Sequence, residues 1–229
     1  MEYPPFPGIR QQGMAFLEDL RANNERDWFK PRKATYDDEL LWPFRCLLVD
    51  CGQRLAQRGL PLIGDPKAGT FRIYRDTRFS KNKAPYKTQV SGVLSRTGSR
   101  KDVGSVYIHV EPGNVFLASG YWRPENKLLR HWRTRMADAP EAFLAMVEET
   151  EGHDGLKLEP ADKLKRMPRG FESLAESDIA PFLKWKSFVA IKKLGDDVVT
   201  TPAFADDVVA FCEQSLPLLQ FGWELQAEA

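Results

Sequence analysis

The residues with the clearest chemical character lie in one segment, residues 71–87, which reads FRIYRDTRFSKNKAPYK. It holds six cationic side chains and a single acid, Asp76, so its formal charge is +5. The whole chain carries +1, so the remaining residues together carry −4. The cations are Arg72, Arg75, Arg78, Lys81, Lys83 and Lys87. Positive charge concentrated in a near-neutral chain is typical of a local site for an anion.

The neighbouring residues fit phosphate or carboxylate binding. If residues 71–76 are extended, Arg72, Tyr74 and Asp76 project to one face. Asp76 could then orient Arg72 or Arg78 through a bidentate pair and leave the other cations for a ligand. The Ser80 hydroxyl and the backbone N–H groups of the following loop suit a phosphate group. The predicted ligand-binding residues are Arg72, Arg75, Arg78, Ser80, Lys81, Lys83, Tyr86 and Lys87.

Three residues are candidates for proton transfer: Tyr74, Asp76 and His109. His109 lies in a strand-like segment, and its alternation places Tyr107 and Glu111 on the same face. That arrangement could be a general base with an orienting carboxylate. A surface histidine on an antiparallel sheet explains the pattern equally well, so no catalytic residue is assigned.

Structural explanations of these residues also remain open. The arginines and lysines of residues 71–87 could pair with some of the 32 acids of the chain. Residues 23–29 could form a polar rim in which Asn24 and Arg26 face a ligand. They could equally connect two helices, with an Asn as the C-cap and Trp28 and Phe29 in the core, and turn chemistry favours this connector.

Helical periodicity dominates the first part of the chain. One helix is expected between Gly8 and Asn23. A second is expected from near Pro31 to Gly59, and Pro43 should kink it or split it in two.

β-prone segments separated by short turns follow, which favours an antiparallel meander. They cover residues 71–74, 90–94, 106–110 and 115–117. Helical patterns return near residues 128–136, 140–147 and 179–183, followed by a strand at 187–194 and a last helix after Thr201. The loop between Gly152 and Gly170 carries no predicted element. The pattern predicts one α+β domain over residues 1–229, a mainly antiparallel sheet with helices packed on it from both chain ends.

Composition and missing motifs exclude several classes of protein. A net charge of +1 argues against a protein that coats nucleic acid. No apolar run reaches the ~18 residues of a membrane span, and the N-terminus lacks a leader pattern, so we expect a cytoplasmic protein without a membrane partner. Three scattered cysteines and three scattered histidines predict neither a disulfide framework nor a metal site. Dinucleotide, P-loop, serine hydrolase and zincin motifs are absent, and no cofactor is indicated.

Several motifs resemble one uncharacterised family, domain of unknown function 2461. The central match is RIYRDTRFSKNKAPYKT, and further matches extend over nearly the whole chain: residues 23–29, 120–124, 130–133 and 164–171. Asn82 departs from the family, whose members often carry an acid there, and this makes the segment slightly more cationic. The resemblance implies no activity.

The sequence therefore predicts a local cationic site for a small molecule that bears phosphate or carboxylate. Two alternatives from other classes stay open. The same cations could bind nucleic acid, with Phe79 and Tyr86 as stacking platforms, or the segment could be structural in an interaction protein. The sequence leaves open whether the protein is an enzyme and how many copies assemble.

Overall fold

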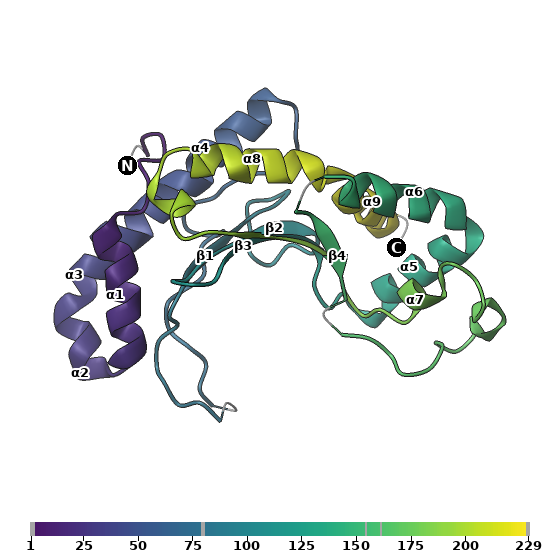
Figure 1. The fold of residues 1–229 in the computed structure, drawn as a ribbon, viewed down its shortest axis with the longest axis horizontal. Coiled ribbons are helices and arrows are strands. Elements are labelled where there is room, and N and C mark those ends of the chain that lie inside the picture. Colours follow the sequence, from purple (N-terminus) through teal and green to yellow (C-terminus); the bar gives the residue numbers. More distant parts are fainter. Residues whose placement is uncertain (1–2, 79–80, 154, 161, 228–229) are drawn as a thin grey trace. The chain divides into compact units, whose positions relative to one another are not determined.

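The computed structural model describes residues 3–78, 81–153, 155–160 and 162–227 (Figure 1). Five strands form one sheet in the order β1-β2-β3-β5-β4, and their pairing is antiparallel. The strands are β1 (Val90–Leu94), β2 (Ser105–Val110), β3 (Val115–Tyr121), β4 (Lys157–Glu159) and β5 (Phe188–Leu194). Helices from both ends of the chain accompany this sheet, which confirms the predicted α+β class.

The chain divides into two compact units, which we describe separately. Unit 1 comprises residues 1–102, 107–117 and 193–210, and unit 2 comprises residues 103–106, 118–192 and 211–229. The expectation of a single domain over residues 1–229 stays a prediction.

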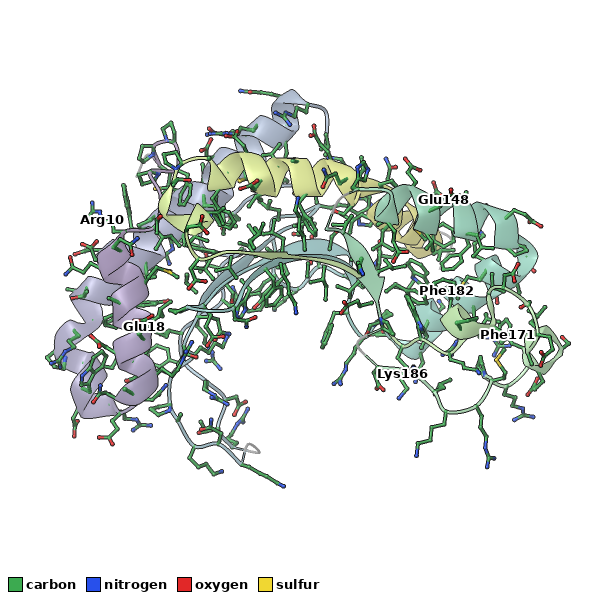
Figure 2. All side chains as sticks on the ribbon, in the orientation of Figure 1. Arg10, Glu18, Glu148, Phe171, Phe182 and Lys186 are labelled. Atoms are coloured by element: carbon green, nitrogen blue, oxygen red, sulfur yellow. The ribbon has the colours of Figure 1, made fainter. Side chains whose placement is uncertain are left out.

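The first helices of unit 1 enclose an aromatic cluster. Phe16 of α1 lies 6.1 Å from Phe29 and 6.2 Å from Tyr36, measured between ring centroids. These helical segments are α1 (Gln11–Ala22), α2 (Arg26–Phe29), η1 (Lys30–Arg32), α3 (Lys33–Tyr36), the π-helical η2 (Asp37–Leu41) and α4 (Trp42–Gln57). Arg10, labelled in Figure 2, joins the start of α1 to Glu39 of η2 through an ion pair. Pro43 lies in the first turn of α4, directly after the π-helical turn, and the backbone stays helical through Leu41 and Trp42, so the helix is not split in two at this proline. The predicted kink stays a prediction.

Helix α4 packs against β1, where Gly92 leaves room for Phe44 and Leu48 of the helix. Two later segments add to unit 1: η4 (Val198–Thr200) and most of α8 (Phe204–Gln214). Phe204, Val208, Phe211 and Cys212 of α8 are buried, as the helical periodicity predicts.

Unit 2 is built around a stack of aromatic rings. Trp132 lies parallel to Phe188, with 4.2 Å between the ring centroids, and meets Tyr121 edge-on at 5.3 Å. Phe182, labelled in Figure 2, packs against Phe143. The helices of this unit are α5 (Asn126–Asp138), α6 (Pro140–Glu151), η3 (Glu172–Leu174), α7 (Ala180–Leu183) and α9 (Leu216–Ala227).

Two elements of the second half of the chain differ from the sequence prediction. Residues 157–159, expected in a loop, form β4, because Leu158 is buried and pairs with Ala190 of β5. The C-terminal helical region holds two helices, because the chain leaves α8 at Ser215 and starts again as α9. The Ser215 hydroxyl bonds back to the carbonyl of Phe211, a local bond that competes with helix continuation.

Residues 70–92 form an irregular hairpin whose first arm was expected to be a strand. Among the described residues of the hairpin, the arms pair at two isolated bridges, Thr70 with Gly92 and Tyr74 with Tyr86. The two bridges are four positions apart on the first arm and six on the second, so the register shifts between them. The predicted alternation holds nonetheless: Arg72, Tyr74 and Asp76 are exposed, whereas Ile73 between them is buried.

Within the described ranges, no helix is both long and apolar enough to cross a bilayer.

Gly120 provides a test of the close backbone packing in unit 2. Its φ is +128°, and an added Cβ would lie 2.2 Å from the carbonyl oxygen of Phe188. We expect Gly120→Ala to lower the free energy of unfolding by at least about 3 kcal/mol, through left-handed strain plus overpacking. Gly113→Ala is the matched control, because Gly113 has a φ of +76° but open space around it, and should cost about 1 kcal/mol. Equal losses in urea denaturation would contradict the close approach.

Candidate functional site

An open pocket of about 320 Å³ lies within unit 1. Its walls come from α2 to α4, from the turn before residue 70 and from the first arm of the hairpin. The lining residues are Phe29, Lys33, Tyr36, Asp37, Leu41, Arg45, Lys67, Thr70, Phe71, Arg72, Ile73, Tyr74 and Arg100. Its volume falls in the usual range for small-molecule sites.

Positive charge dominates this pocket. Among the lining residues that the structure describes, five are cationic and one, Asp37, is a carboxylate, an excess of four positive charges. Asp37 forms an ion pair with Lys33 one helical turn away. No described carboxylate lies within ion-pair distance of Arg45, Lys67 or Arg72.

Arg45 carries an unpaired donor on the wall of the pocket. Its Nε is buried and has no hydrogen-bond partner among the described residues. The neighbouring Tyr36 is buried as well, and this burial is the main reason that its pKa is raised well above 10. The tyrosine hydroxyl therefore keeps its proton at neutral pH. A buried donor without an acceptor costs about 1–3 kcal/mol, so the Nε of Arg45 is an unsatisfied donor at the pocket wall.

Arg100 fixes the shape of one wall. One of its terminal nitrogens donates to the carbonyl oxygens of Lys67, Ala68 and Thr70 at 3.4, 3.0 and 3.3 Å. Asp65 caps the same turn by accepting from the N–H groups of Lys67 and Ala68. The charge of Arg100 thus faces the pocket while its donors hold the turn.

Aromatic rings link the hairpin to the helices. Tyr86 stacks on Phe29 with 4.1 Å between centroids, and Tyr74 follows at 5.6 Å from Tyr86. Tyr86 is 3% exposed, whereas Tyr74 is 48% exposed and lines the pocket. The structure therefore places Tyr86 behind the pocket wall and Tyr74 on it.

The other predicted site residues lie outside the pocket lining. Arg78 donates twice to Asp76, at 3.0 and 2.8 Å, which is the bidentate pair that the sequence analysis allowed. This pair lowers the pKa of Asp76 to about 2. Lys83 donates to the carbonyl of Thr77, and Lys81 is exposed. Ser80 and Phe79 lie outside the described residues.

Lys87 is partly buried on the inner side of the hairpin. Its ammonium lies 5.3 Å from the centroid of the Phe71 ring. Burial lowers the pKa of Lys87, and the charges of Arg72, Arg100 and Arg75 lower it further. Lys87 and Arg75 thus belong to the same positively charged region as Arg72, although neither lines the pocket.

His109 lies in a polar network on β2. Its Nδ1 is 2.9 Å from the Tyr107 hydroxyl, and its Nε2 is 3.4 Å from a carboxylate oxygen of Glu111. Glu111 also accepts hydrogen bonds from Thr88 and Asn114. The predicted shared face of Tyr107, His109 and Glu111 is therefore confirmed. The network connects β2 to the second arm of the hairpin, and its role in catalysis stays a prediction.

Sequence reasoning missed four cations of the pocket: Lys33, Arg45, Lys67 and Arg100. They come from separate helices and turns, and each one alone looks like an ordinary surface residue. No local signal could have grouped them. Across the described ranges, no cluster of three or more His, Cys, Asp or Glu side chains could hold a metal ion.

The fold and this pocket define an α+β protein with an open, positively charged pocket next to an aromatic stack. A family model described as a conserved hypothetical protein family, DUF2461, matches residues 12–221, so the chain belongs to this family. Comparison with curated proteins gave no significant match, and neither did comparison with solved structures.

Asn24 holds the hairpin against the helices and can be tested directly. Its amide donates to the Tyr86 carbonyl at 3.1 Å and accepts from the Tyr86 N–H at 3.0 Å, which supports the connector role of residues 23–29. We expect Asn24→Ala to lower the free energy of unfolding by about 1–3 kcal/mol, since two partly buried bonds are lost. Asn23→Ala, which loses one exposed bond to Asp19, should cost less than about 1 kcal/mol in the same denaturation experiment.

The His109 network predicts a pH dependence of stability. Burial lowers the pKa of His109 below its ordinary value of 6.5, against the opposing effect of Glu111. The unfolded chain therefore binds more protons than the folded one below about pH 6.5, so stability should fall as the pH falls through this value. His109→Gln should flatten the stability profile between pH 7.5 and 5.5, above the range in which carboxylates titrate. His153→Gln, at an exposed position, is the matched control for the loss of a histidine.

Proposed function

We propose that this protein binds a small molecule bearing phosphate or carboxylate in the pocket of unit 1. The observation that carries the proposal is the buried Nε of Arg45, which lacks an acceptor within a pocket of four excess positive charges. An anion would accept from this donor and from the protonated Tyr36, and would offset the mutual repulsion of the cations.

The other cations of the pocket have different roles in the proposed binding. Arg72 and Lys67 are exposed at the rim, where they can attract an anion and then pair with it. Arg100 holds the 67–70 turn and adds its charge. We propose binding and no reaction. A cytoplasmic setting fits the three cysteines, which are all free thiols, as in proteins of reducing compartments.

Thermal denaturation with and without inorganic phosphate tests the proposal. Phosphate at 100 times its dissociation constant should stabilise the wild type by about 2.7 kcal/mol, which is about 5–11 °C for a chain of this size. Arg72→Ala should melt at the wild-type temperature or slightly above it without phosphate, because it removes a cation from a positively charged pocket. It should lose tenfold or more in affinity, because a bond to a charged group is lost.

Arg78→Ala is the matched control, since Arg78 belongs to the same hairpin but bonds to Asp76 away from the pocket. It should keep the phosphate response. Loss of the response in Arg78→Ala with retention in Arg72→Ala would place anion binding at the hairpin tip and contradict the proposal. No stabilisation of the wild type by phosphate or sulfate would also contradict it.

A further inference from the structure

Three aromatic rings of unit 1, Phe29, Tyr86 and Tyr74, form a row that we call the aromatic ladder, and Tyr74 is its exposed end. Phe29 is 1% exposed, and Tyr86 stacks on it with an angle of 25° between the ring planes. Tyr74 is the next ring, tilted by 48° to Tyr86. Among the described rings, Tyr74 contacts Tyr86 alone, and Tyr74 lines the pocket.

The exposure of Tyr74 is unusual for a ring of its size. It is one of four exposed large apolar side chains in the described part of the chain, and it lies within the pocket lining. A tyrosine held on a rigid stacked partner loses little further freedom when a second ring covers it. The exposed end of the aromatic ladder is therefore a platform for a planar ring.

The position of Arg72 sets the distance between ring and anion. Arg72 and Tyr74 are two residues apart on the first arm of the hairpin, which bends at Ile73, and both line the pocket. Their Cα atoms are thus separated by at most about 7 Å, the reach of two extended residues. A pentose spans a similar gap between a phosphate group and an attached heteroaromatic base. A bare anion would use the cations and leave the Tyr74 ring uncovered.

We propose that the ligand of this pocket is a nucleotide, whose base stacks on Tyr74 and whose phosphate is bound by Arg45, Arg72 and Lys67. This inference rests on the proposed function and deepens it by naming the ligand class. The base is recognised by its flat face, so the platform accepts more than one base. The phosphate provides the negative charge that offsets the excess of cations in the pocket.

Calorimetric titration with three ligands separates the contributions. The ligands are inorganic phosphate, ribose 5-phosphate and adenosine 5′-monophosphate, each at constant ionic strength. We expect the monophosphate of adenosine to bind about tenfold or more tightly than ribose 5-phosphate, because of stacking on an aromatic side chain. Tyr74→Ala should remove this advantage and leave the affinity for ribose 5-phosphate within twofold of the wild type.

Two further variants guard against an effect of misfolding. Tyr74→Phe retains the ring and should keep the advantage of the base. Tyr74→Leu retains an apolar contact with Tyr86 but has no aromatic face, and should lose the advantage while melting close to the wild type. The same loss in Tyr74→Phe and Tyr74→Leu would overturn stacking as the cause.

The outcomes distinguish this inference from the proposed function. If none of the three ligands binds, anion binding itself fails. If phosphate and ribose 5-phosphate bind but the base adds nothing, or if Tyr74→Ala retains the advantage, the nucleotide inference alone is overturned. A single-stranded oligonucleotide that binds more than tenfold tighter than the mononucleotide near physiological salt would also overturn it, in favour of a nucleic-acid ligand.

Discussion

The stack of Tyr86 on Phe29 is the interaction on which the pocket of unit 1 depends. The hairpin of residues 70–92 has few ladder bonds between its arms, so its backbone pairing alone cannot fix its position. Burial of the Tyr86 ring contributes on the order of 1.5–3 kcal/mol, and an aromatic pair adds about 0.5–1.5 kcal/mol. The two bonds from Asn24 to the Tyr86 backbone then set its orientation. Because the first arm pairs with Tyr86 through Tyr74, the same contact places Arg72 and Tyr74 on the pocket wall.

The second constraint is the cost of gathering like charges. The hairpin offsets part of this cost internally, since Asp76 accepts from Arg78 and a backbone carbonyl accepts from Lys83. Arg100 does the same with three carbonyls, and Lys33 pairs with Asp37. Arg45, Arg72 and Lys67 have no such compensation among the described residues. The cations thus fall into two groups. Those of the first group pair with acceptors of the fold, and those of the second group have no described acceptor.

The sequence was informative where the helical or strand periodicity of a single segment decided which side chains share a face. The buried stripe of α8 and the shared face of Tyr107 and His109 both follow from local spacing. It was less informative where tertiary contacts decided. β4 forms because its partner β5 is adjacent, and three residues have too little pattern to predict a strand. The pocket shows the same limit. Arg72 stood out in a cationic run, but Arg45 and Lys67 became visible as its neighbours only once the chain had folded.

The charged and aromatic side chains of residues 71–87 therefore fall into two groups with different physical explanations. One is structural: Tyr86, Asp76 and Arg78 are satisfied within unit 1, and the fold alone accounts for their residue types. The other is found at Arg72 and Tyr74, whose exposed charge and exposed ring contribute little to folding at these positions. A purely structural role does not explain an arginine without a described partner two residues from a half-exposed tyrosine ring. Because both features converge on one pocket with the unpaired Nε of Arg45, the proposed binding of an anion would explain their combination more economically than stability does.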